Sequence, residues 1–289
     1  MEAHTPRLPS RASRDRVLAD DPELVELGLQ TDAAHINLHF YNFEKHDYSA
    51  RELEAITGVY DAALGDLDVA LAELFKGLEH EGLLQNTIVV LTSDHGENLG
   101  DHHLFNHRFT LADSLTHVPL IAWVPGQPGG RLSGPVSTMD LFPTLCDWAG
   151  IPVPEGLEGA HLLDAPRPAV TRMELPLRRE VETVQSVHAD VDIEPWMRSG
   201  YAVVGAELGK VVRWDQGAVE GFDLAADPGE RSPMAADEQL LGVLADWVAS
   251  VPAYDPSLRT AADEPVHVRA SQADLRAALE AMGYTAPDE

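Results

Sequence analysis

Thr87-Ile88-Val89-Val90-Leu91-Thr92, followed directly by Ser93-Asp94-His95-Gly96-Glu97, is the stretch that decides the fold of this chain. Its first half is a continuous β-branched and apolar run, which predicts a strand buried on both faces, as in parallel sheets. Ligands of open α/β sheets bind at the carboxyl ends of the strands. The polar half therefore lies where chemistry usually occurs, and Gly96 lets the backbone turn close to a bound group.

A long amphipathic helix is predicted just before this strand. Ser49 and Glu52 form a capping box, and apolar residues recur at helical spacing as far as Gly82. Residues 118–124 predict a second strand, which the Pro125-Gly126 pair ends. A helix followed by buried strands indicates an α/β layer.

The rest of the chain is predicted to form different kinds of secondary structure in different regions. Residues 1–48 are predicted to be irregular, with one strand in the run Ile36–Phe43. Ser137 and Asp140 make a second capping pair, so a helix is expected there, ending at Gly150. After residue 165 the pattern predicts a small antiparallel sheet and two closing helices, with strands at 201–204, 210–214 and 219–224 and helices at 236–250 and 271–282.

Composition excludes several classes of partner. The 289 residues include 20 basic and 48 acidic side chains, so the formal charge of −28 would repel nucleic acid. Only three basic residues are lysines, which resembles proteins of a salt-rich cytoplasm, although an ordinary organism of high GC content remains an alternative. The longest apolar stretch, residues 118–125, is too short to span a membrane, and no signal peptide is recognisable. The chain is therefore expected to be cytoplasmic.

The loop after the decisive strand carries candidate metal ligands. Asp94 supplies a hard anionic oxygen for a divalent cation, and His95 can contact a metal or a bound oxyanion. Five histidines fall within 23 residues, at positions 95, 102, 103, 107 and 117. An ordinary acidic loop that binds no metal remains an alternative. A zinc site is another: His103 and His107 have the i, i+4 spacing of helical zinc ligands, but the glutamate base that accompanies such a pair is absent. The single cysteine, Cys146, excludes an internal disulfide and is predicted to lie in the core.

The run Asn86–Glu97 resembles the sulfatase signature of the alkaline phosphatase superfamily, and further blocks agree in order over residues 50–232. These blocks are Tyr60-Asp61-Ala62-Ala63-Leu64 with Leu67-Asp68, His117-Val118-Pro119-Leu120-Ile121, Asp140 through Pro152 with Leu157-Glu158-Gly159, and Phe222-Asp223-Leu224 with Asp227-Pro228-Gly229-Glu230. Met1 to Pro6 resembles an internal motif of the family, in which a strand ends at a histidine. The sequence thus resembles a sulfatase truncated at its N-terminal side.

The resemblance also implies what this sequence lacks. The family's nucleophile lies in a Cys/Ser-x-Pro-x-Arg motif, which does not occur here, and neither do the two metal-binding aspartates of the opening strand. Arg7-Leu8-Pro9-Ser10-Arg11 imitates the end of that motif, but Arg7 cannot act as a nucleophile, and we interpret the match as coincidence. Cys146 has no following proline and arginine and cannot replace it.

Roles carry over from the family only where residues match. The resemblance implies that Asp94 is a metal ligand, to calcium or another divalent cation, and that His95 is its neighbouring ligand or a sulfate contact. His4 would bind a sulfuryl oxygen or protonate the leaving group. His107 falls near a lysine position of the family that holds the substrate oxyanion, with Arg108 as the substitute candidate.

The expected architecture follows the same resemblance. It implies the later part of an alkaline-phosphatase-like mixed sheet with helices on both faces, in residues 1–165, and a small antiparallel subdomain in residues 166–289. The expected function is hydrolysis of a sulfate ester or sulfated glycan by an incomplete chain without a nucleophile. A related metal-dependent phosphatase or phosphodiesterase is the first alternative, and a noncatalytic remnant or binding module is the second. An upstream-encoded fragment or self-association would complete the fold.

Overall fold

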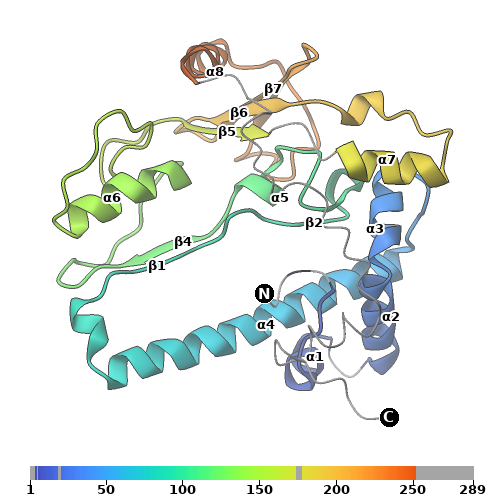
Figure 1. Cartoon of the computed structure of the whole chain (residues 1–289), viewed down its shortest axis with the longest axis horizontal. Helices are drawn as coiled ribbons and strands as arrows, with labels where there is room; N and C mark the ends of the chain where they lie inside the picture. Colours follow the sequence, from blue (N-terminus) through green and yellow to red (C-terminus); the bar gives the residue numbers. More distant parts are fainter. Residues whose placement is uncertain (1–3, 5, 19–20, 174–177, 252–289) are drawn as a thin grey trace. The chain divides into compact units, whose positions relative to one another are not determined.

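The long helix α4, Ala50–His80, packs against helices of the N-terminal region (Figure 1). The structure is a computed structural model that describes residues 4, 6–18, 21–173 and 178–251. The predicted capping box is confirmed, since the Ser49 side chain accepts from the Glu52 backbone and the Glu52 side chain accepts from the Ser49 backbone. The closing helix expected at 271–282 lies outside the described residues.

Three helices, and no strand, occupy the described part of residues 1–48: α1 (Arg11–Val17), α2 (Pro22–Ala33) and α3 (His35–Asn42). The prediction of a strand at residues 36–43 is therefore wrong. Leu38 and Tyr41, three residues apart, pack together against Ile56 and Phe105, and this spacing belongs to a helix. Asp21 as N-cap, directly before Pro22, is the signal that the sequence interpretation overlooked.

The decisive strand is β1 (Val89–Thr92), which pairs antiparallel with β4 (Leu120–Trp123). These two strands form a two-stranded sheet, so within the described residues each leaves one edge unpaired. The prediction of a strand buried on both faces is wrong here, because β1 is only partly buried. On β4, Ile121 is 61% and Trp123 54% exposed. Both side chains are thus largely exposed, although their sequence is that of a core strand, and the Trp123 indole N–H donates to the Leu84 carbonyl at 3.2 Å.

Salt is expected to drive self-association through this partly exposed pair of strands. Unpaired edges and exposed apolar side chains favour association, and salt screens the charge of −28 that opposes it. Light scattering and amide hydrogen exchange across a salt series test this. A monomer at every salt concentration, with residues 88–91 strongly protected, would contradict the prediction.

Short elements lie before β1, between β1 and β4, and between β4 and the C-terminal sheet. They are η1 (Leu83–Asn86), β2 (Asn98–Leu99), η2 (Asp101–His103), β3 (Phe105–Asn106), α5 (Asp113–Thr116), η3 (Thr138–Asp140) and α6 (Leu141–Trp148). The second predicted capping box, Ser137 with Asp140, is confirmed. Cys146 on α6 is a free, buried thiol, as expected.

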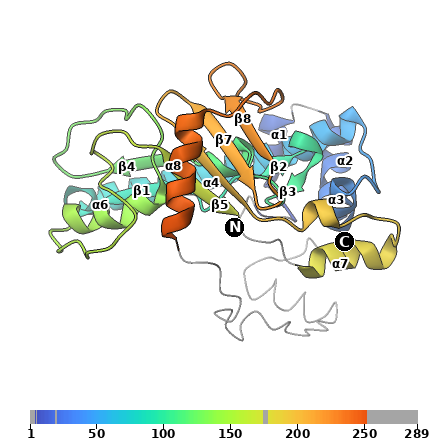
Figure 2. The same cartoon turned by 90° about the horizontal axis from the view of Figure 1, so that it is seen from above.

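The predicted antiparallel sheet follows. It comprises β5 (Ala169–Met173), β6 (Gly200–Val204), β7 (Gly209–Trp214) and β8 (Val219–Asp223), paired in that order. Helix α8 (Glu238–Ser250) packs on β6 and β7 (Figure 2), while α7 (Arg178–Val187) and η4 (Glu194–Trp196) precede the sheet's second strand. The α/β class is confirmed, and all described strand pairs are antiparallel. None of the described helices combines the length and apolar character that a membrane span requires.

Candidate active site

The loop after β1 is held against α5. The Gly96 N–H donates to the Leu115 carbonyl at 2.9 Å, and a Cβ added at Gly96 would lie 2.0 Å from the Ser114 carbonyl oxygen. Only glycine allows this approach. Nδ1 of His95 lies 2.8 Å from the Gly96 carbonyl oxygen; since a carbonyl can only accept, Nδ1 is the donor, and Nε2 is left for other partners.

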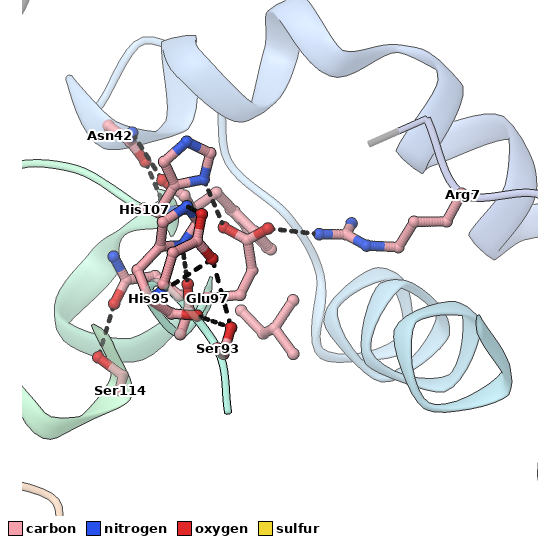
Figure 3. Close-up of polar contacts among 12 residues, drawn as sticks. Arg7, Asn42, Ser93, His95, Glu97, His107 and Ser114 are labelled. Atoms are coloured by element: carbon pink, nitrogen blue, oxygen red, sulfur yellow. Dashed lines mark hydrogen bonds and ion pairs between the residues drawn. The ribbon is translucent and has the colours of Figure 1, made fainter. Parts of the chain in front are cut away.

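Three histidines predicted to serve the site lie together. The His95 and His107 rings stack with centroids 4.2 Å apart and planes 24° from parallel. Figure 3 labels both residues together with Glu97. The His4 ring lies 6.2 Å from His107, tilted by 54°. The structure thus brings together residues from the N-terminus, the β1 loop and the segment after β3.

His107 is positioned from two sides. Asn42 of α3 fixes the preceding strand, because its side-chain amide donates to the Phe105 carbonyl and its side-chain oxygen accepts from the Phe105 N–H, at 3.1 and 2.7 Å. Nδ1 of His107 faces Oε1 of Glu97 at 3.4 Å. Both atoms are buried, and neither has a hydrogen bond within the described part of the chain. The two side chains therefore face each other at a distance and angle outside those of a hydrogen bond.

Arg7 connects the cluster to the helices. Its side chain is 2% exposed, with Nη1 at 2.5 Å from Oδ1 of Asp32 and Nη2 at 2.8 Å from Oε2 of Glu97. The guanidinium also lies 5.1 Å from the centre of the Tyr60 ring, within cation–π range. The sequence interpretation dismissed Arg7 as part of a chance motif and did not single out Glu97 or Asp32. No local pattern joins these residues, which are far apart along the chain.

Asp94, the expected metal ligand, points largely into solvent, with a side chain 86% exposed. The charge of the neighbouring His95 and the hydrogen bond from the His95 N–H hold the pKa of Asp94 below its ordinary value. Among the described residues no three His, Cys, Asp or Glu side chains gather as a metal site would require. The donor set therefore does not fit a complete calcium site, which needs six to eight oxygens.

The two histidines considered as zinc ligands do not come together. His103 stacks on Tyr41, with ring centroids 3.9 Å apart, whereas His107 stacks on His95, so this pair does not supply the zinc site that its spacing allowed. Burial lowers the pKa of the Arg108 guanidinium. His117 contacts Asp113 at 3.8 Å.

Calcium is expected to bind this chain only weakly, with a dissociation constant of roughly 10⁻³ M or above, because a calcium site needs about six or more oxygen ligands and Asp94 is the one carboxylate assigned as a ligand. Isothermal titration calorimetry on the purified chain measures this, with Asp94→Asn as the comparison. A tight site that Asp94→Asn removes would contradict the expectation.

The chain is similar in sequence to known sulfatases. The sulfatase family model matches residues 19–151. Arylsulfatase K of Bos taurus is 31% identical over 202 residues, which make up 65% of this chain and 35% of that protein. The same protein of Canis lupus familiaris is 37% identical over 117 residues, 40% of this chain and 22% of that protein. The chain thus spans about a third of the length of the first of these relatives.

Solved structures of similar fold include both sulfatases and phosphonate hydrolases. The phosphonate monoester hydrolase of Agrobacterium radiobacter has a TM-score of 0.55 and 26% identity, and the match covers 70% of this chain and 42% of that one. A 2-O GAG sulfatase has a TM-score of 0.55 and 24% identity, with 70% and 43% covered. The shared fold is the alkaline-phosphatase-like one.

Proposed function

Because this chain belongs to the sulfatase family, we propose that His4, His95 and His107 bind the sulfuryl oxygens of a sulfate ester as part of a sulfuric ester hydrolase. The observation that carries the proposal is the stacked pair of His95 and His107 with His4 beside it. Imidazole N–H groups gathered at one place are suited to the oxygens of a tetrahedral anion.

Each residue has a distinct proposed role. The Nδ1 atom of His95 donates to the Gly96 carbonyl, and its Nε2, which lies 3.7 Å from Oδ2 of Asp94, is the atom proposed to contact the anion. Glu97, whose Oε1 lies 3.4 Å from Nδ1 of His107, orients that ring, and its other nitrogen is proposed to contact a substrate oxyanion. His4 binds a sulfuryl oxygen or gives its proton to the leaving oxygen. Sulfatases use a divalent metal to stabilise charge on the sulfuryl group; since the described donor set here is incomplete, we assign no step to it.

The proposed substrate is a small sulfate ester or a sulfated glycan. A neighbour of the same fold was solved with its substrate D-glucosamine-2-N,6-O-disulfate, which makes a sulfated sugar a reasonable first probe. The unpaired edges and exposed apolar side chains of the β1 and β4 pair support a further segment of polypeptide that covers this face, with self-association as the alternative occupant.

Inorganic sulfate tests the binding role directly. We expect added sulfate to shift the ring resonances of His4, His95 and His107 in NMR spectra of the chain, and His107→Asn to weaken binding at least about tenfold. His80→Asn is the matched control, because His80 lies exposed at the end of α4. Sulfate that shifts none of the three rings, or that loses affinity equally in both variants, would refute the proposal.

A phosphate or phosphonate ester is the second candidate substrate. The observation that favours it is the fold shared with a phosphonate monoester hydrolase at 26% identity, since both ester types present tetrahedral oxyanions. The same titration with inorganic phosphate separates the two: tighter binding of phosphate than of sulfate would favour the phosphatase interpretation. A noncatalytic anion-binding module would bind either anion without turnover.

A further inference from the structure

A buried ion cluster joins strand β7 of the C-terminal sheet to helix α5, which contacts the loop that carries His95. The Lys210 side chain, on β7, is 0% exposed, and its Nζ lies 2.8 Å from both Oδ1 of Asp113 and Oε1 of Glu230. The other Glu230 carboxylate oxygen accepts the backbone N–H of Asp113. Two carboxylates and one ammonium therefore fix the first residue of α5 through its side chain and its backbone.

The α5 turn in turn supports the loop that carries His95. Leu115 accepts the Gly96 N–H, and the Ser114 hydroxyl donates to the side-chain oxygen of buried Asn98 at 2.7 Å. Gly96 and Asn98 flank Glu97, the partner of His107 and Arg7. Lys210 is thus connected to His95 in three steps: its ion pair with Asp113, the backbone of α5, and the hydrogen bonds that Gly96 makes with Leu115 and with the His95 ring.

We propose that Lys210 is a positioning residue: by holding Asp113 and Glu230 together it fixes the α5 turn, and through that turn the conformation of the His95–Glu97 loop. A buried ion cluster contributes little net stability for the desolvation it requires, and its best-attested use is to select one arrangement. This cluster can select the position of α5, because α5 is a single four-residue turn and the cluster holds its first residue through both the side chain and the backbone N–H. The C-terminal sheet thereby becomes part of the site's support.

The experiment compares local opening of the loop with global stability. Lys210→Met is expected to speed hydrogen exchange of the Gly96 amide at least about tenfold beyond what its effect on global unfolding explains, and to shift the His95 and His107 ring resonances. Lys210→Arg, which keeps the charge, is expected to restore much of the protection. Val203→Ala is the matched control, since Val203 is buried on β6 against Leu244 of α8 and lies outside the ion cluster.

The outcomes decide the proposal without reference to sulfate binding. If Gly96 exchange in Lys210→Met changes only as much as in Val203→Ala at equal loss of stability, Lys210 is a structural residue and the proposal is overturned. Should Lys210→Met fail to fold, Glu230→Gln takes its place, because it removes one charge and keeps an acceptor oxygen. Its Gly96 hydrogen exchange and its histidine ring resonances are then measured in the same way. A chain that binds no sulfate but shows the local effect would leave this inference standing and refute only the proposed function.

Discussion

Purified residues 1–289 are expected to release no measurable sulfate from an aryl sulfate, even with calcium present. No Cys/Ser-x-Pro-x-Arg motif occurs in the sequence, and loss of a nucleophile lowers turnover by about 10⁶-fold in enzymes where it has been separated from the other groups. Cys146 offers no substitute because it is buried in α6. Arg7, which stands where the motif's nucleophile would, is tied to two carboxylates.

A chromogenic aryl sulfate and a matching aryl phosphate, each assayed with an active sulfatase or phosphatase as positive control, measure this. Hydrolysis above the buffer rate that disappears in Asp94→Ala would contradict the prediction, because it would require a nucleophile that the sequence analysis missed. Turnover that appears only when a second polypeptide carrying the motif is added would support the proposal of a further segment of polypeptide.

Replacing Arg7 by methionine is expected to lower the free energy of unfolding by about 3–5 kcal/mol, the usual consequence of removing one partner from a buried ion cluster. The reason is electrostatic. Asp32 is fully buried and Glu97 nearly so, and without the guanidinium both carboxylates would remain charged in a medium that solvates them poorly. The lost contact with Tyr60 adds to the effect.

Arg11→Met is the matched control, since Arg11 is 88% exposed and pairs with exposed Asp15 in the next turn of α1. Its unfolding free energy is expected to stay within about 0.5 kcal/mol of the parent chain. Combining Arg7→Met with Asp32→Asn and Glu97→Gln is expected to recover much of the loss, because the buried charge disappears while acceptor oxygens remain. Chemical denaturation monitored by circular dichroism gives all three values. An Arg7→Met variant as stable as the Arg11→Met control would contradict the prediction.

The helices and strands that the sequence predicted are those with local signals. Both capping boxes, Ser49 with Glu52 and Ser137 with Asp140, are closed by hydrogen bonds between residues three apart. A segment of four residues is therefore enough to predict each of them. The C-terminal strands are short apolar runs with nearby turns, and each pairs with the next strand along the chain. Where such signals existed and were overlooked, as at Asp21-Pro22, the prediction failed for residues 1–48.

The sequence by itself determined the family signature, the likeness of the blocks around it and the identity of the three histidines. Only the tertiary structure decided that His4, His95 and His107 meet, that Arg7 is the buried centre of an ion cluster, and that Lys210 reaches α5. Glu97 lies 90 residues from Arg7, and Lys210 lies 97 from Asp113. Pairs at such separation leave no trace in local periodicity, because their free energy depends on burial and charge that exist only once distant segments have packed together.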